Sequence, residues 1–479
     1  MNRCRIPDWI ACKSYTKNVF HRYLAKVDKS RTIISNNKNH QTILLEDDAS
    51  DLYEFISSFS DWVPVIALEN YAKEHNLQDT LYSFLEELST NDLLEIEGYN
   101  YDKSYRKMYF EDTSDEVIKE EKAIEDDMSK WTFDNGFLWS IFFEMTYKCN
   151  LKCIHCYNNK CDFKSQIKYE DAVKIIDDAG KLGCFNVTFS GGECTLDSDF
   201  LKIIQYAHSK RMNINVFTNG QTLHDNSEFF EEVLKCYPFR IGVSIYSADS
   251  NKHDTVTGIK GSFDKSIATL KKLRDRGVNI EVKSVQLKET VDTWKETLKL
   301  AKSFDATASI DATLTPTIDG DKYTQNHTVS DEKLMELCMD STSPLYVGNM
   351  DIEKDYREPN LDIDGPCGAG IKTLLITPTL DLTACVSLPI KFGNLKNKSL
   401  FNIWEDAVFF KNKDSELYKW QHTVLSQFKD CFKEEYCKFC HFCPGMGLLE
   451  NGKLFTRSEY LCHIAKIKME AYKKLKNIK

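Results

Sequence analysis

Six short strand-like runs of apolar residues alternate with helical segments in the central part of the chain. These strand-like segments lie at residues 137–146, 185–193, 213–220, 240–248, 279–287 and 308–316, and helical patterns such as residues 169–183 and 262–277 separate them. Such a succession of strands and helices predicts parallel βα units, arranged as an open sheet or as a partial barrel. In both architectures, ligands bind at the carboxyl ends of the strands.

The amino-terminal part of the chain has a different pattern. Residues 32–46 form two β-rich runs around an Asn-rich turn, which predicts a hairpin. Three helical patterns follow, at residues 47–59, 65–75 and 77–96. A hairpin followed by three helices is typical of a winged-helix-like domain, which binds DNA, dimerises or binds a peptide. The acidic character of these helices weighs against DNA.

Two further segments complete the organisation. Residues 111–127 are dense in charge and poor in apolar side chains, so we expect a linker or a solvated helix. From about residue 360 the pattern is irregular and cysteines become frequent. The sequence therefore predicts a winged-helix-like domain at residues 1–105, an acidic linker at 106–134, a βα core at 135–345 and a cysteine-rich domain at 346–479.

Composition narrows the class of protein. The 479 residues are 42% hydrophobic, which is enough for several cored domains. The sequence shows no secretion signal and no apolar run of about eighteen residues, so we expect a cytoplasmic protein without a membrane span. The net charge of −11 argues against general nucleic-acid binding. In a reducing compartment, clustered members of the 17 cysteines are expected to be metal ligands or redox groups.

The first cluster of cysteines follows the first predicted strand. Cys149, Cys153 and Cys156 have the spacing C-x3-C-x2-C. A structural zinc site is closed by four ligands, usually as two separated pairs, so the trio suits zinc poorly, and His155 would reach the metal awkwardly as a fourth ligand. A [4Fe-4S] cluster with one open iron fits three thiolates better, because the open iron accepts a substrate or cofactor.

The segments that follow carry a resemblance to a known family. CNLKCIHCY, FSGGECTL, FTNG and SIYSADSNKHDTVTGIKGSF resemble, in order and spacing, the motifs of radical S-adenosylmethionine (SAM) enzymes. The resemblance implies that the trio holds the radical-generating cluster. It also implies SAM contacts from a set of motif residues, namely Gly191, Gly192, Glu193, Thr218, Asn219 and Ser244. Cys194 stands where the family motif has proline.

The resemblance also implies a fold and a reaction. The fold is a partial (β/α)6 barrel of the TIM-like kind. In the reaction, the reduced cluster passes an electron into SAM, which releases methionine and a 5′-deoxyadenosyl radical that removes hydrogen from an unactivated C–H bond. A partner that supplies electrons, such as flavodoxin or ferredoxin, is implied as well.

The second cysteine field resembles the SPASM extension, which holds one or two auxiliary [4Fe-4S] clusters. It contains the seven cysteines that the extension typically uses: Cys367, Cys385, Cys431, Cys437, Cys440, Cys443 and Cys462. The x5, x2 and x2 spacings from Cys431 to Cys443 depart from the family pattern, and Leu380 stands where glycine is common. The residues alone leave a structural zinc ribbon as the alternative.

These seven cysteines are expected to divide into two sets. One set would be Cys437, Cys440, Cys443 and Cys462. The other would be Cys367, Cys385 and Cys431, which leaves an iron open to a substrate thiolate. The isolated cysteines are expected to be ordinary thiols, namely Cys4, Cys12, Cys161, Cys184, Cys236 and Cys338, with Cys194 the one isolated thiol that its motif makes a functional candidate.

The amino-terminal hairpin and helices resemble the peptide-recognition element of ribosomal-peptide biosynthesis, which is related to the PqqD-like chaperone of pyrroloquinoline quinone assembly. TILLEDDASDLYEFI and LYSFLEELSTNDLLEI carry this likeness. It implies that a precursor peptide binds through its leader, added as a strand to an exposed edge of the hairpin.

The sequence therefore predicts a maturase that modifies a ribosomally made precursor peptide, with a thioether crosslink from cysteine sulfur to carbon as the first hypothesis. Carbon–carbon crosslinking or Cα epimerisation of such a peptide is the close alternative. An enzyme of the anaerobic sulfatase-maturating type is a further one, which the amino-terminal domain disfavours. A transcription regulator with redox-sensing clusters would need a basic recognition helix, and the third helical pattern is acidic.

Overall fold

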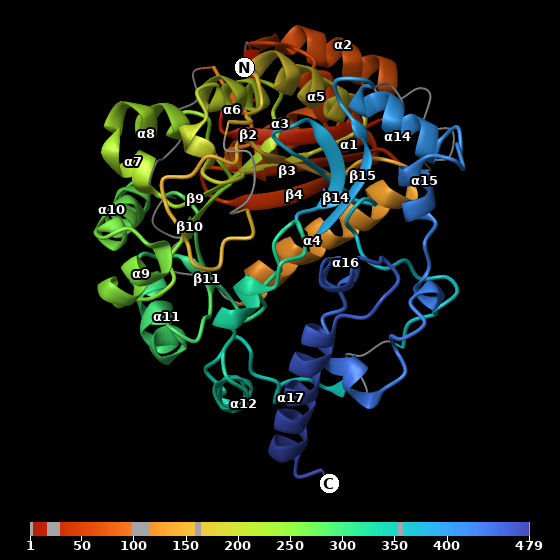
Figure 1. The fold of residues 1–479 in the computed structure, drawn as a ribbon. Helices are drawn as coiled ribbons and strands as arrows, with labels where there is room; N and C mark the ends of the chain where they lie inside the picture. Colours follow the sequence, from red (N-terminus) through yellow and green to blue (C-terminus); the bar gives the residue numbers. More distant parts are fainter. Residues whose placement is uncertain (1–2, 17–28, 98–114, 159–163, 353–357, 479) are drawn as a thin grey trace.

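The computed structural model describes residues 3–16, 29–97, 115–158, 164–352 and 358–478. A nine-stranded sheet with the order β12-β11-β10-β9-β8-β7-β13-β14-β15 forms its centre (Figure 1). Six parallel strands match the six predicted ones: β7 (Ser140–Glu144), β8 (Asn186–Ser190), β9 (Asn213–Thr218), β10 (Arg240–Ser244), β11 (Ile280–Val285) and β12 (Thr307–Asp311). The expected partial (β/α)6 barrel is confirmed.

Three more strands come from the region expected to be irregular. β13 (Thr373–Ile376) runs parallel to β7, and β14 (Asp381–Cys385) and β15 (Leu388–Asn394) form an antiparallel hairpin beside it. The cysteine-rich region therefore extends the sheet of the barrel. Cys385 sits at the last position of β14, next to the turn that leads into β15.

Helices cover one face of the barrel sheet (Figure 1). On β8, Val187 and Phe189 are fully buried toward that face, whereas Thr188 between them is half-buried. Phe189 stacks on Phe143 of β7 at 5.6 Å between ring centroids. The helices of this part are α5 (Tyr169–Lys181), α6 (Phe200–Ser209), α7 (Gln221–Asp225), α8 (Ser227–Leu234), α9 (Ser250–Thr257), α10 (Ser262–Asp275) and α11 (Trp294–Ser303).

The amino-terminal domain contains a three-stranded antiparallel sheet, ordered β2-β3-β4, and three helices. The predicted hairpin is β3 (Arg31–Asn36) and β4 (Gln41–Glu46), and the predicted helices are α1 (Asp47–Ser57), α2 (Val65–His75) and α3 (Leu81–Thr90). A small second sheet joins β5 (Val63–Pro64), β1 (Arg3–Arg5) and β6 (Glu95–Ile96). β2 (Ile10–Tyr15) was not predicted, because its Lys13 turns inward and donates to Gly180 O at 2.6 Å, which breaks the usual apolar alternation.

This domain is bound to the amino ends of the barrel strands. Arg211, just before β9, donates to the carbonyl oxygens of Ile6, Pro7 and Ile10 at 3.0 to 3.2 Å. The hydroxyl of Tyr15 donates to Gly183 O at 2.8 Å, just before β8. Two further links reach the loops before β10 and β11, from Asn37 to Tyr237 O at 3.0 Å and from His40 to Gly277 O at 3.1 Å.

The acidic segment between the domains forms a helix, α4 (Asp115–Asp134). Residues 98–114, where the predicted linker begins, lie outside the described residues. The carboxyl end of α4 packs on the amino-terminal sheet: Met128 is buried with Ile33, and the Trp131 ring lies 5.4 Å from the ring of Tyr15. Arg31 of β3 pairs with Asp127 at 2.8 Å. This end of the helix therefore holds the amino-terminal domain against the barrel.

The carboxyl-terminal part packs along the side of the barrel and extends beyond the carboxyl ends of its strands. Its helical elements are α12 (Asp331–Met339), α14 (Leu400–Val408), α15 (Glu416–Gln421), α16 (Pro444–Asn451), α17 (Glu459–Lys476) and the 3-10 turns η4 (Tyr323–His327), η5 (Leu425–Gln427) and η6 (Glu435–Phe439). Two more 3-10 turns, η2 (Cys194–Leu196) and η3 (Val291–Thr293), belong to the barrel. Helix α17 packs against α12 and η6 and ends near the carboxyl terminus (Figure 1).

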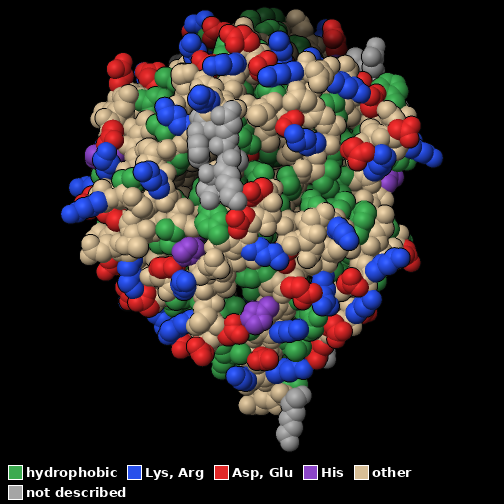
Figure 2. All heavy atoms as spheres, in the orientation of Figure 1, with side chains coloured by type: hydrophobic (Ala, Val, Ile, Leu, Met, Phe, Trp, Pro, Cys, Tyr) green, Lys and Arg blue, Asp and Glu red, His purple; other side chains and the backbone are tan. Residues whose placement is uncertain are grey.

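Charged side chains of both signs are interspersed over the visible face of the molecule (Figure 2). None of the helices among the described residues combines the length and apolar character that crossing a bilayer demands.

Candidate active site

The cysteine trio lies in the loop after β7, at the carboxyl end of the first barrel strand. Gly191 and Gly192, which follow β8, press against this loop. A Cβ atom on Gly191 would lie 2.4 Å from Thr146 O, and one on Gly192 would lie 2.5 Å from Lys148 O. The backbone N–H of Gly192 donates to Thr146 O at 2.7 Å. The two glycines are thus required for close contact between the two loops of the protein.

The three thiols lie close together and are half-buried. Burial raises the pKa of Cys149 to about 11, with a contribution from Cys156. Burial also raises the pKa of Cys153 to about 12, with contributions from the other two thiols. Neutral thiols are therefore favoured until a cation replaces the protons, as metal binding does.

Each sulfur of the trio has a hydrogen-bond donor beside it. Cys149 Sγ accepts from the backbone N–H of Leu151 at 3.4 Å. The hydroxyl of Tyr246 bonds to Cys153, and the backbone of Asn158 bonds to Cys156. Donors of this kind stabilise thiolates that ligate an iron–sulfur cluster. The donor set and its surroundings therefore fit such a cluster.

Glu193 forms the hub of the site. Its carboxylate is 1% exposed. Oε1 accepts from Thr195 N at 3.1 Å, Thr195 Oγ1 at 2.6 Å and Thr218 Oγ1 at 2.7 Å. Oε2 accepts from the backbone N–H of Asn219 at 2.7 Å, and the N–H of Glu193 donates to Lys148 O at 2.9 Å. The motif residues after β8 and β9 are thereby joined to the cysteine loop.

The motif residues Thr218 and Asn219 lie next to Glu193, and their side chains make bonds within the protein. Thr218 Oγ1 donates to Glu193 and accepts from Gly220 N at 3.0 Å. Asn219 Nδ2 donates to Asn150 Oδ1 at 2.7 Å. Ser244 ends β10 and hydrogen-bonds to the buried hydroxyl of Tyr246. All six residues expected to bind SAM therefore gather at the carboxyl ends of β8, β9 and β10.

Two residues of the site were missed in the sequence. Glu144, at the end of β7, is 1% exposed and accepts from Tyr157 Oη at 3.1 Å and Asn158 Nδ2 at 3.3 Å. Burial raises the pKa of this carboxyl group. The ring of Tyr246 lies edge-on to His155 at 4.7 Å. The signal for Glu144 is a glutamate that ends an apolar strand directly before the cysteine loop.

The face of the barrel sheet opposite the helices carries half-buried side chains. The ring centroids of Phe142 and Phe217 are 6.2 Å apart, and the Nζ of Lys283 lies 4.2 Å from the centroid of the Phe217 ring. A Cβ on Gly242 would lie 2.8 Å from this Phe217 ring. The side chains on this face are therefore only partly covered. Phe142 lies on β7, two residues before the strand ends and the cysteine loop begins.

The structure divides the seven carboxyl-terminal cysteines differently from the expected split. One set comprises Cys431, Cys437, Cys440 and Cys462. Burial raises the pKa of Cys440 to about 12, and the charges of the other three thiols also raise it. Cys367, Cys385 and Cys443 form a second set: burial raises the pKa of Cys385 to about 11, with contributions from the other two. Compared with the split expected from the sequence, Cys431 and Cys443 each belong to the other set.

Packing explains the exchange. Cys443 is the N-cap residue of α16, and a Cβ on Gly445 in the first turn would lie 2.0 Å from Ser387 O. The start of α16 is therefore pressed against the turn that follows Cys385. Helix α17 packs on η6, which brings Cys462 to Cys437. These contacts are tertiary, and sequence spacing does not reveal them.

A loop after β12 connects the trio to both carboxyl-terminal sets. Tyr323 donates its hydroxyl to Cys156 O, and Ile318 N donates to Tyr157 O at 3.4 Å. In the same loop, Thr315 Oγ1 lies 3.4 Å from Ser387 Oγ, two residues after Cys385. Residues 312–314 bond to the hydroxyl of Tyr460, two residues before Cys462, at 3.1 Å.

Leu380 keeps the conformation that a glycine would adopt. Its φ is 64°, in the left-handed region, and its N–H donates to Thr377 O at 2.8 Å in the turn before β14. The left-handed conformation costs about 1 kcal/mol for a residue with a side chain. Burial offsets this cost, because Leu380 is only 3% exposed and packs in the main core.

The remaining cysteines are core residues where the structure describes them. Cys4, Cys184, Cys236 and Cys338 are buried, and Cys12 is half-buried. Cys161 lies outside the described residues. Cys194 is fully buried and donates to Phe217 O at 3.4 Å, and burial raises its pKa well above the usual value. This thiol therefore serves packing in place of the motif's proline.

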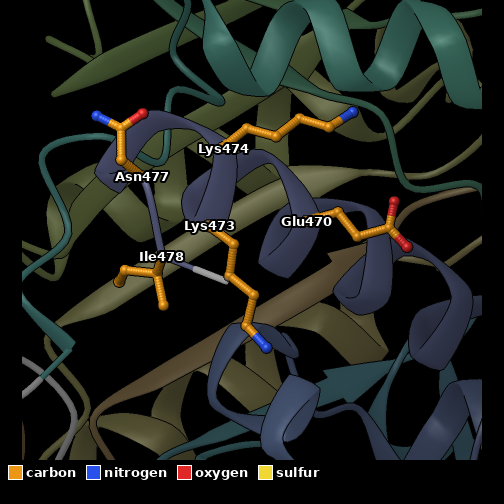
Figure 3. A pocket seen from close by; sticks show the side chains of 5 residues that line it. All are labelled: Glu470, Lys473, Lys474, Asn477 and Ile478. Atoms are coloured by element: carbon orange, nitrogen blue, oxygen red, sulfur yellow. The ribbon is translucent and has the colours of Figure 1, made fainter.

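No group of three or more His, Cys, Asp or Glu side chains in the described part of the chain is arranged to hold a single metal ion. His155 contacts Tyr246, and burial lowers its pKa to about 4. A pocket at the far end of α17 from Cys462 is lined by polar and charged side chains and one apolar residue, namely Glu470, Lys473, Lys474, Asn477 and Ile478 (Figure 3). It contains no thiol and is separate from the cysteine sets.

Comparison with known proteins agrees with this geometry. Residues 143–301 match the family model of the radical SAM superfamily. The AdoMet-dependent heme synthase of Methanosarcina barkeri is 25% identical over 342 residues, covering 67% of this chain and 95% of the synthase. The antilisterial bacteriocin subtilosin biosynthesis protein AlbA of Bacillus subtilis is 28% identical over 324 residues, covering 64% of this chain and 66% of AlbA.

A solved structure matches almost the whole chain. Streptococcus suis SuiB, bound to the precursor peptide SuiA, aligns over 96% of this chain and 99% of its own, with a TM-score of 0.55 and 15% sequence identity. This likeness shows a shared fold. The family match indicates SAM and a [4Fe-4S] cluster as cofactors of this chain. The trio fits the radical-generating cluster, and the other two thiol sets fit auxiliary clusters.

We predict that Gly192→Ala prevents assembly of the radical-generating cluster. The added Cβ would meet the carbonyl oxygens of Lys148 and Tyr147 at 2.5 Å and push the cysteine loop away. Iron content and the SAM-dependent change of the electron paramagnetic resonance (EPR) signal measure the loss. Gly180→Ala in α5 is the matched control, because its Cβ meets nothing within 4 Å. Full cluster loading in Gly192→Ala would contradict the role of this contact.

We also predict that pairs of cysteine substitutions reveal the two auxiliary sets. Cys443→Ser combined with Cys367→Ser should lose no more iron than either single change, because one cluster of about four irons is removed. Cys443→Ser combined with Cys437→Ser should lose about eight irons, because two clusters are removed. Iron analysis and Mössbauer spectra check this. A loss of one cluster in the second pair would restore the split expected from the sequence.

Proposed function

Because this chain contains a radical SAM domain and is a radical SAM enzyme, we propose that it is a maturase that modifies a ribosomally synthesised precursor peptide. The modification we propose is a thioether crosslink from a cysteine sulfur to a carbon atom. The carboxyl-terminal region would act as a SPASM domain and the amino-terminal region as a PqqD-like leader-binding element.

The match to SuiB over nearly the whole chain carries this proposal. The heme synthase match covers 67% of this chain, whereas the SuiB match covers 96%. The amino-terminal domain therefore has a structural counterpart in a protein bound to its precursor peptide. The partial similarity to AlbA, a bacteriocin biosynthesis protein, points to the same class of substrate.

The incomplete thiol set supports the thioether. Cys367, Cys385 and Cys443 come together without a fourth cysteine among the described residues. A cluster held by three thiolates has an iron free for a further sulfur ligand, such as a cysteine of the peptide. The loop after β12 reaches from Cys156 to the turn after Cys385, so the two reaction partners would be held on either side of it.

In the proposed mechanism, the chain's own residues hold the radical-generating cluster, fix the loops around it and line the face where the peptide would lie. Cys149, Cys153 and Cys156 would hold the radical-generating cluster, and Glu193 fixes the loops around it. Phe142, Phe217 and Lys283 line the half-buried face where a peptide segment would lie. When bound, SAM and the clusters supply a 5′-deoxyadenosyl radical, a site for the peptide sulfur and an acceptor for the electron released on C–S bond formation.

The leader would bind at β4. This strand is an edge of its sheet and pairs only with β3 among the described residues, so its outer side can take an added strand. The amino-terminal domain sits at the amino ends of the barrel strands, and the site sits at their carboxyl ends. A strand of five residues spans about 17 Å. The precursor would therefore need a spacer between its leader and the modified residue.

The alternative reactions make different demands on the structure. Carbon–carbon crosslinking or epimerisation would use the same radical site without needing an open iron in the second set. An enzyme of the sulfatase-maturating type would not need the amino-terminal domain. An electron donor such as flavodoxin or ferredoxin is required in each case, because the cluster must be reduced before SAM is cleaved.

The proposed reaction predicts a defined mass change. Co-expression with a cysteine-containing candidate precursor, sought among short open reading frames beside the gene, should yield a peptide lighter by two hydrogen atoms, with its cysteine protected from alkylation by iodoacetamide. Tandem mass spectrometry checks both features. Cys153→Ser is the inactive control. A lighter peptide whose cysteine still alkylates would indicate a carbon–carbon bond, and an unchanged mass with a changed stereocentre would indicate epimerisation.

The leader site predicts a separation of binding from chemistry. Leu45→Asp on β4 should weaken binding of a fluorescent leader peptide by about tenfold or more, which corresponds to the loss of an apolar contact of about 1.4 kcal/mol. Leu45 also packs against the amino-terminal core, so thermal unfolding of the variant is measured beside binding to show that the domain stays folded. Uncoupled SAM cleavage should be unchanged. Ile66→Asp on α2 is the matched control, since Ile66 is 62% exposed and lies away from β4. Equal anisotropy titrations for both variants and the native protein would exclude β4. Point variants are needed, because truncation would expose Phe137 and Phe185 under the amino-terminal domain.

A further inference from the structure

Asn219 joins the two motifs on which the radical site depends. The residue follows β9 directly and is 7% exposed. Its backbone N–H donates to Glu193 Oε2 at 2.7 Å. Its Nδ2 donates to Asn150 Oδ1 at 2.7 Å and points to Cys149 Sγ at 3.9 Å. A single residue thus contacts the carboxylate of the GGE motif and the first cysteine of the trio.

The orientation of its amide group is fixed by its neighbours. Oδ1 accepts from the backbone N–H of Gln221 at 3.0 Å, so Nδ2 must face Asn150 and Cys149. The carbonyl oxygen of Asn219 accepts from Ser266 Oγ of α10 at 2.8 Å. Both amide hydrogens are therefore directed at the cysteine loop, and neither is left to bind a ligand.

The target of this amide has a second hydrogen-bond donor. Cys149 Sγ also accepts from Leu151 N–H at 3.4 Å. Reduction adds negative charge to an iron–sulfur cluster, so N–H groups aimed at its sulfurs stabilise the reduced form and raise its reduction potential. A donor at Cys149 would therefore make the cluster easier to reduce.

We propose that Asn219 is a positioning residue for the radical-generating cluster and not a SAM ligand. It holds Asn150 and Cys149 in place and raises the reduction potential of the cluster through its N–H group. This assignment replaces the SAM contact expected from the sequence. It depends on the trio holding the cluster and is independent of the substrate.

The test compares three variants of the full-length, anaerobically reconstituted protein. Asn219→Asp keeps the acceptor for Gln221 and replaces the donor to Cys149 by a negative oxygen, and Asn219→Ala removes the side chain. Asn213→Ala is the matched control: Asn213 is a buried asparagine at the other end of β9, and its side chain bonds to Asn186 Oδ1 at 2.9 Å. Two quantities are measured, the midpoint potential by EPR-monitored titration and the SAM dissociation constant by equilibrium dialysis. The signal that changes when SAM is added identifies the cluster of interest.

We expect the midpoint potential of the cluster to be more negative in Asn219→Ala than in the native protein, and more negative still in Asn219→Asp. The SAM dissociation constant should stay within about twofold of the native value in both variants. Loss of this cluster alone in Asn219→Ala, with a loaded Asn213→Ala control, also supports the positioning role. A dissociation constant raised by about fivefold or more, the effect of one lost hydrogen bond, at an unchanged potential would identify Asn219 as a SAM ligand and overturn the proposal. Unchanged values of both quantities in both Asn219 variants would overturn it as well.

Discussion

The buried carboxylate of Glu193 organises the active site. It is a negative group with almost no exposure, and no cation pairs with it among the described residues; its charge is stabilised by four hydrogen bonds from Thr195, Thr218 and Asn219. A buried charge that lost these donors would be strongly destabilising. The loops after β8 and β9 are therefore fixed to each other, and the N–H of Glu193 fixes both to the cysteine loop at Lys148 O. The geometry of the trio depends on this arrangement.

The barrel separates the amino-terminal domain from the candidate active site. The amino-terminal domain is bonded to the loops at the amino ends of the strands through Arg211, Tyr15 and Asn37. The trio and the motif residues lie at the carboxyl ends, where the loop after β12 links them to the two carboxyl-terminal thiol sets. Under the proposed function, a leader bound at one end and chemistry at the other would allow one leader to present many different modified segments.

Local patterns in the sequence predicted the features that depend on neighbouring residues. The six barrel strands and the trio follow from alternation and from x3 and x2 spacing, so they were found. β2 was missed because Lys13 turns into the interface, and β13 to β15 were missed because their partners are distant in sequence. The grouping of Cys431 and Cys443 depends on α16 meeting the turn at Ser387 and on α17 meeting η6, which only the folded chain reveals. Asn219 belonged to a recognised motif, but its bonds to Asn150 and Cys149 required the structure.

The chemistry proposed for this chain depends on a radical-generating site at the trio after β7. Its most direct test is the amount of 5′-deoxyadenosine formed when the anaerobically reconstituted, chemically reduced protein is given SAM. We expect 5′-deoxyadenosine from the native protein and none from Cys153→Ser. Native protein that carries its full iron and binds SAM but forms no 5′-deoxyadenosine would contradict it.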